Sequence, residues 1–273
     1  MLGMLVKHEI KYIWKKMLLL ALVLMSATVI GCLAIRSFGS LNGSSSAWTT
    51  VMFMLGVMGY YGILVVVVYG YLVITAVRFY KNVYGDEGYI TNTLPVTARQ
   101  IHLSKVLVYS VGQLIISILS IISVLAVGYS LALEISEAAE ISFDEVFTML
   151  NTPYAAALLV IIAIMIIISS FSNVTGVFGA VALGQYWKKH KIVGAVVSYV
   201  IIAFVTSVLS SVFVTIPIIA NSLQAGEGAF DTASQSAKMM LQTFCSSTAV
   251  CLIVGVICYI ITDYGLNRKL NLE

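Results

Sequence analysis

The sequence predicts an all-α polytopic membrane protein with six transmembrane helices, and three observations support this fold class. Hydrophobic residues make up 60% of the 273 residues and charged residues only 10%, whereas soluble domains contain roughly 25% charged residues. The mean hydropathy is +1.01. Six apolar runs are separated by polar segments, and each run is long enough to cross the hydrocarbon layer as a helix. We therefore expect a single transmembrane domain over residues 1–273.

The first 16 residues, MLGMLVKHEIKYIWKK, are predicted to form an amphipathic helix in the membrane interface. Apolar side chains recur at helical spacing with four lysines between them, which suits a helix whose basic side meets lipid headgroups. A solvated tail is the alternative interpretation. The uncharged run over residues 17–35 forms the first span. The residues before Cys32 resemble a lipoprotein cleavage box, but five further spans make a lipid anchor redundant, so we expect no processing there.

Five further spans follow, and capping signals support several of their ends. Ser142 and Glu145, after the third span, have capping-box spacing and predict a short external helix. Thr152 followed by Pro153 is typical of a helix start, and Pro217 lies near the outer end of the fifth span. The predicted spans are residues 51–77, 106–133, 153–185, 192–219 and 239–262.

The distribution of basic residues predicts the orientation of the chain. Of the 15 Lys and Arg residues, only Arg36 and Lys238 lie on one side of the predicted membrane, and the other 13 lie on the opposite side. Basic residues concentrate in cytoplasmic segments. Both termini and the stretch 78–105 are therefore predicted to be cytoplasmic.

Several classes of function are disfavoured by what the sequence lacks. It contains no GxxxxGK[ST] phosphate loop, so the chain is not expected to hydrolyse nucleotides itself. Its histidines are scattered, no nucleophile–base pair is evident, and the net charge of +3 is too small to indicate nucleic-acid binding. The middle of each span lacks Asp, Glu, Lys and Arg, which argues against a carrier with a buried carboxylate relay. We expect no catalysis, metal or cofactor in this chain.

Two kinds of pattern within the spans have a structural and a functional interpretation. Small residues every four positions in the fourth span favour a packing or dimer face, with a substrate path as the alternative. Rows of hydroxyl residues in the third and fifth spans can bond to their own helix backbone, or they can line a polar passage between helices. The small residues are Ser172, Gly176, Ala180 and Gly184, and the polar rows are Ser110, Gln113, Ser117 and Ser120, and Ser207, Ser211 and Thr215.

The longest hydrophilic interior segment is residues 78–105. Gly85 suits the end of the helix that continues from the second span, and Asp86 suits the N-cap of a short helix over residues 86–93. Proline disfavours helix at the residue before it, so Leu94-Pro95 would end that helix. The segment is predicted either to protrude as a cytoplasmic knob or to lie in the interface as a tyrosine-anchored loop.

The start of the next helix also carries a signal. Thr97 and Gln100 have the spacing of a capping box. We therefore expect the helix of the third span to begin at this point, well before its apolar run.

Three stretches resemble ABC-2 type permeases, most closely those paired with bacitracin- and lantibiotic-type ATPase subunits of Gram-positive bacteria. Residues 84–89 (YGDEGY), 93–96 (TLPV) and 104–105 (SK) look like the first cytoplasmic loop of that family. Residues 5–11 (LVKHEIK) look like its interfacial elbow helix, and residues 182–185 (ALGQ) resemble the end of its fourth span. The segment between the fifth and sixth spans is short for the family's re-entrant outer helices.

The resemblance implies a type V ABC exporter fold in a bacterial cell membrane. Two permease chains, identical or homologous, would bind two ATPase subunits that carry ATP and magnesium, and the cargo would be an amphipathic peptide or antibiotic. Residues 86–93 would be the coupling helix. The residues implied at the ATPase contact are Asp86, Glu87, Gly88, Tyr89, Leu94 and Pro95.

A different class of function stays open. A non-transporting membrane protein could use the same stretch, residues 78–105, to recruit or regulate a soluble partner. In either case the apolar spans are expected to contact membrane lipid.

Overall fold

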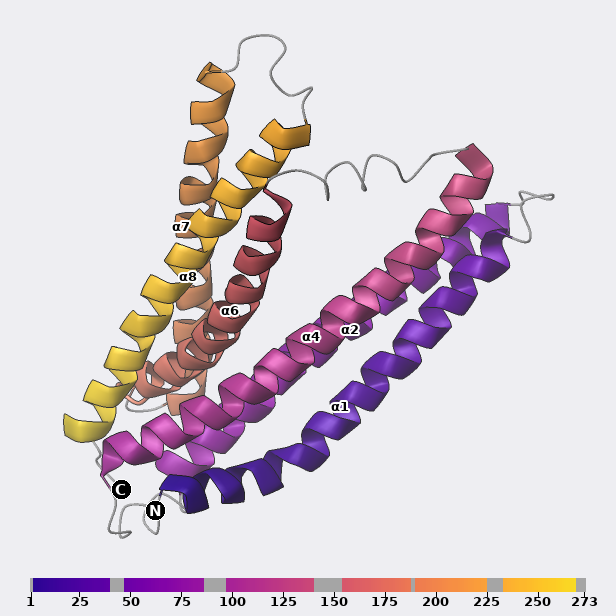
Figure 1. The fold of residues 1–273 in the computed structure, drawn as a ribbon. Coiled ribbons are helices and arrows are strands. Elements are labelled where there is room, and N and C mark those ends of the chain that lie inside the picture. Colours follow the sequence, from indigo (N-terminus) through magenta and orange to yellow (C-terminus); the bar gives the residue numbers. More distant parts are fainter. Residues whose placement is uncertain are drawn as a thin grey trace.

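The computed structural model describes residues 2–39, 47–85, 97–139, 154–187, 190–224 and 233–268, and it is helical almost throughout these ranges (Figure 1). The described part of the chain contains no strand. Each of its helices is long and apolar enough to cross a membrane, so the all-α fold with six candidate spans is confirmed. The helices are α1 (Leu2–Gly39), α2 (Ala47–Val83), α4 (Ala98–Ala139), α6 (Ala155–Gly184), α7 (Lys191–Gln224) and α8 (Ala233–Arg268).

All six helices are longer than a membrane requires. The shortest, α6, has 30 residues and the longest, α4, has 42, which corresponds to roughly 45–63 Å at 1.5 Å per residue against about 30 Å of hydrocarbon. The described part of the predicted interfacial segment, residues 2–16, and the first span are parts of one continuous helix, α1, which changes direction along its N-terminal part (Figure 1). Charged residues are therefore carried on helical turns that extend past the apolar runs.

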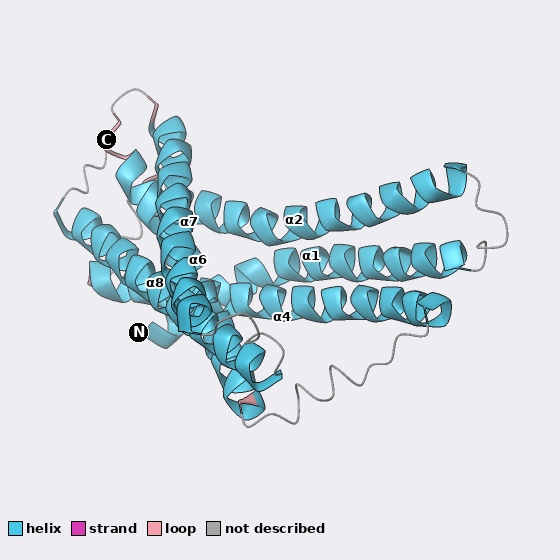
Figure 2. Ribbon diagram, turned by 90° about the horizontal axis from the view of Figure 1, so that it is seen from above, coloured by secondary structure: helices cyan, strands magenta, loops and turns pink. Residues whose placement is uncertain are grey.

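The helices form two groups of three that meet at one end. Helices α1, α2 and α4 pack together along their length, and helices α6, α7 and α8 form the second group. The groups touch at the end where both termini lie and diverge toward the opposite end (Figures 1 and 2). This arrangement leaves an angle between the groups, with α2 and α4 on one side and α6 on the other (Figure 1).

A cluster of aromatic rings, called here the aromatic joint, connects the two groups at their closed end. Phe79 of α2 stacks on Phe178 of α6 with ring centroids 4.0 Å apart, and Tyr109 of α4 meets Phe178 edge-on at 5.8 Å. His102 of α4 stacks on Tyr259 of α8 at 4.6 Å. Within the described residues neither ring nitrogen of His102 has a hydrogen-bond partner, so the imidazole packs as a flat ring.

The helix ends beside residues 86–96 follow the predicted signals. Helix α2 ends at Val83, and the Gly85 amide donates to the Tyr80 carbonyl at 3.0 Å. At the start of α4 the Thr97 amide donates to Gln100 Oε1 and the Gln100 amide donates to Thr97 Oγ1, both at 3.4 Å. The predicted capping box is therefore confirmed.

Other predicted features lie outside the described residues. These are the short helix over residues 86–93, the Leu94-Pro95 break, the Ser142–Glu145 capping box and the Thr152-Pro153 helix start.

Helices α6 and α7 form a tight hairpin that depends on glycine. A Cβ atom at Gly184 would lie 2.5 Å from the backbone nitrogen and 2.7 Å from the Cα atom of Ala195. A Cβ atom at Gly194 would lie 2.8 Å from the Trp187 ring. The two helices can approach this closely only because both positions lack a side chain.

Candidate functional site

A buried ionic cluster, the Glu9 clamp, ties α1 to the helices on both sides of residues 86–96. Lys105 of α4 donates to Glu9 Oε1 at 2.5 Å, and the Tyr109 hydroxyl donates to Glu9 Oε2 at 2.9 Å. From α2, Asn82 Nδ2 donates to Glu9 Oε1 at 3.3 Å, and Arg78 Nε lies 3.9 Å from Glu9 Oε2. One carboxylate thus holds α2 and α4 to α1.

The clamp is shielded from solvent, which strengthens its electrostatic interactions. Glu9 is 5% exposed and Lys105 is 2% exposed. The Arg78 guanidinium also lies over the Tyr12 ring of α1, 3.9 Å from its centroid, a favourable cation–π geometry. Because a buried charge that loses its partner is costly, the three helix segments are held in one arrangement.

Weaker contacts connect this end of α2 and α4 to α8. Arg99 at the start of α4 pairs with Asp263 at 3.2 Å, but the arginine side chain is 76% exposed, so this pair contributes little. Tyr84 follows α2, and a Cβ atom at Gly265 of α8 would lie 3.9 Å from its hydroxyl. Burial, with a smaller contribution from Tyr186, raises the pKa of Tyr84, so its hydroxyl stays neutral.

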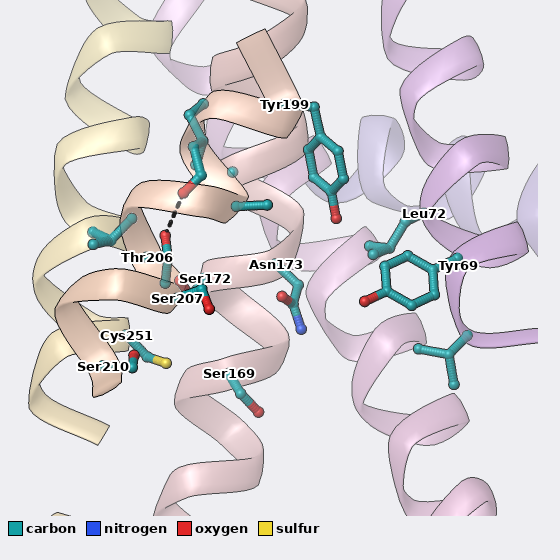
Figure 3. Close-up of a pocket in the computed structure, with 15 residues that line it drawn as sticks. Tyr69, Leu72, Ser169, Ser172, Asn173, Tyr199, Thr206, Ser207, Ser210 and Cys251 are labelled. Carbon is teal, nitrogen blue, oxygen red and sulfur yellow. Dashed lines mark hydrogen bonds between the residues drawn. The ribbon is translucent and has the colours of Figure 1, made fainter. Parts of the chain in front are cut away.

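The second feature is a pocket of about 310 Å³ in the angle between the two helix groups (Figure 3). Tyr69 and Leu72 of α2 form one wall and Tyr199 of α7 forms another (Figure 3). Helix α6 contributes polar and small residues between these walls. The remaining lining residues include Ser169, Ser172, Asn173 and Gly176 of α6, Thr206, Ser207 and Ser210 of α7, and Cys251 of α8.

The predicted small-residue face of α6 divides between the pocket and helix packing. Ser172 and Gly176 line the pocket, and a Cβ atom at Gly176 would meet nothing within 4 Å. Ala180 is 2% exposed, and Gly184 lies against α7 at the hairpin. Whether this face binds another chain or a substrate stays a prediction.

The predicted polar rows of α4 and α7 also lie in different environments. Ser207 lines the pocket, whereas Ser211 and Thr215 lie on the exposed surface of α7 and donate to their own helix backbone at 2.8 and 2.6 Å. On α4, Gln113 and Ser120 are buried, and Ser120 donates to the Ile116 carbonyl at 2.8 Å. Ser110 and Ser117 are half-buried on the same helix.

The six residues implied at the ATPase contact lie outside the described residues. They are Asp86, Glu87, Gly88, Tyr89, Leu94 and Pro95.

Sequence reasoning missed the Glu9 clamp, although part of a signal was present. Arg78 and Asn82 are four residues apart, as are Lys105 and Tyr109, and such pairs share a helix face. Nothing local indicates that Glu9 meets Lys105, which lies 96 residues further along the chain. Within the described ranges no group of three His, Cys, Asp or Glu side chains could hold a metal ion.

Comparison of the chain with family models, with curated proteins and with solved structures finds no match. The candidate sites are therefore inferred from the geometry of the structure alone.

Proposed function

We propose that this chain is the membrane-spanning permease subunit of an ATP-binding cassette exporter, driven by a separate ATPase subunit. The observation that carries the proposal is the Glu9 clamp. It joins the two helices that enter and leave the hydrophilic segment 86–96 to a third membrane helix. A force applied to that segment by a soluble partner would move α1, α2 and α4 together.

The division into two helix groups supports a route for such a movement. The groups meet at the aromatic joint and diverge away from it (Figure 1). A change in the angle between them would alter the space in which the polar pocket lies. The energy would come from ATP, bound with magnesium on the partner.

The remaining parts of the proposal follow from the family resemblance and the charge distribution. We place the chain in a bacterial plasma membrane with both termini in the cytoplasm, paired with a second permease chain. The cargo is an amphipathic peptide or antibiotic. The chain itself has no catalytic role.

The proposal is tested at the segment 86–96. In the purified complex with its ATPase subunit, Glu87→Ala and Tyr89→Ala are expected to lower transport per ATP hydrolysed by at least about fivefold, since coupling energies are typically 1–3 kcal/mol. The measurement is cargo uptake into inverted vesicles alongside phosphate release. Glu227→Ala is the control, because it removes an equal charge from the predicted outer side.

Two outcomes would count against this assignment. Wild-type coupling in both variants would remove the role of residues 86–96. An ATPase partner that binds without any cargo movement would favour the recruiting protein instead.

A further inference from the structure

The pocket between the helix groups is lined by apolar side chains and by polar side chains that carry no charge. None of the 15 described residues that line it is Asp, Glu, Lys, Arg or His. A charged ligand group would have no counter-ion there, and an unpaired charge is costly away from water. The lining therefore favours a neutral ligand group with hydrogen-bonding capacity.

Several polar groups in the pocket have unused hydrogen-bonding capacity. The hydroxyls of Tyr69 of α2 and Tyr199 of α7 point into the space, and Asn173 of α6 lies beside them (Figure 3). In the described part of the chain these three side chains have no hydrogen-bond partner. Thr206 and Ser169 already donate to the carbonyls of Ile202 and Ile166, at 2.7 and 3.1 Å, so they remain available as acceptors.

The unused hydrogen-bonding capacity of Asn173 matters because of its position along α6. On α6 it lies about 27 Å from Ala155 and about 17 Å from Gly184, at 1.5 Å per residue. That depth falls within the apolar run of the span. An amide that lacks partners is costly in hydrocarbon, so a ligand that satisfies it would gain the corresponding free energy.

The lining combines hydroxyls with aromatic rings. Hydroxyls both donate and accept, so they complement a ligand that also carries several hydroxyls. The rings of Tyr69 and Tyr199, with Leu72, provide apolar surface for the C–H faces of a sugar ring. Tyr69 is 55% exposed, and the pocket volume of about 310 Å³ is at the lower end of small-ligand sites, roughly 300–1,000 Å³.

We propose that this pocket binds an uncharged polyhydroxyl group, such as the sugar of a glycolipid, whose apolar part stays among the exposed apolar side chains of α2 and α7. The site does not depend on the proposed transport function, because binding requires neither an ATPase nor cargo movement.

The test compares lipids that differ only in the headgroup. The full chain is placed in phosphatidylcholine nanodiscs with a small fraction of monoglucosyldiacylglycerol, plain diacylglycerol or phosphatidylglycerol of the same acyl chains, and retained lipid is measured by native mass spectrometry. We expect the glucolipid to be retained about tenfold more than either other lipid, a ratio that one or two net hydrogen bonds would supply. Free glucose is a fourth arm that shows whether the apolar part is needed.

A matched pair of glycine variants locates the binding. Gly176→Val fills the pocket, and Gly128→Val on α4 adds the same side chain outside it, since a Cβ atom meets nothing within 4 Å at either position. Gly176→Val is expected to abolish the preference for the glucolipid and Gly128→Val to keep it. Equal retention of all three lipids, an unchanged preference in Gly176→Val, or a preference lost equally in both variants would overturn the proposal.

Discussion

Replacing Glu9 with glutamine is expected to lower the free energy of unfolding by about 3–5 kcal/mol, the range measured when one partner of a buried ion pair is removed. The variant keeps the shape of the side chain but removes the buried carboxylate to which Lys105, Tyr109 and Asn82 donate. Lys105 is 2% exposed, so water cannot replace the lost carboxylate. The measurement is thermal or denaturant unfolding of the purified chain in a fixed detergent.

A double-mutant cycle separates the ion pair from other effects of the substitution. Lys105→Met, combined with Glu9→Gln, removes the buried ammonium and is expected to recover part of the lost stability. Arg99→Gln is the control, because its 76% exposed side chain contributes at most about 1 kcal/mol. If Glu9→Gln unfolds like the wild type, the clamp does not hold the three helices together.

The second large effect is expected at the α6–α7 hairpin. Gly184→Ala should destabilise the protein by about 3 kcal/mol, at the upper end of typical overpacking costs. The new methyl group would lie 2.5 Å from the backbone nitrogen of Ala195, and a backbone atom cannot move away without displacing α7.

Two further variants make this prediction specific. Gly62→Ala on α2 is the matched control, since a Cβ atom there meets nothing within 4 Å, and alanine should stabilise the helix by up to about 1 kcal/mol. Ala195→Gly combined with Gly184→Ala should not restore stability, because the clash is with backbone atoms. Rescue by Ala195→Gly would show that the contact involves only the side chain.

Local signals predicted the helices well. The apolar runs, the glycine after α2 and the Thr97–Gln100 capping box all act within a few residues of the chain, and each appears in the structure as expected. Residues 2–16 of the predicted interfacial segment also formed a helix, but as the beginning of α1. Its continuity with the first span has a simple cause, since no glycine or proline interrupts residues 4–30.

The candidate sites were predicted only in part. Ser172, Gly176 and Ser207 were singled out as pattern residues, and all three line the pocket. Asn173, Tyr69 and Tyr199 were not, because a lone polar residue in an apolar run has no periodic signal. The pocket needs side chains from α2, α6, α7 and α8, and no sequence spacing relates them.

The amino-acid sequence was sufficient to establish the membrane class, the six candidate spans and several helix ends, such as those beside residues 86–96, because hydropathy and capping depend on neighbouring residues. Most helices continue for several residues past the predicted apolar runs. The Glu9 clamp, the aromatic joint and the uncharged pocket arose from packing between distant helices. Glu9 and Lys105 are 96 residues apart. In the sequence both resemble ordinary interfacial residues, whereas in the structure three helices bury them together. Burial is a property of the assembled bundle, and it turns these scattered polar residues into sites.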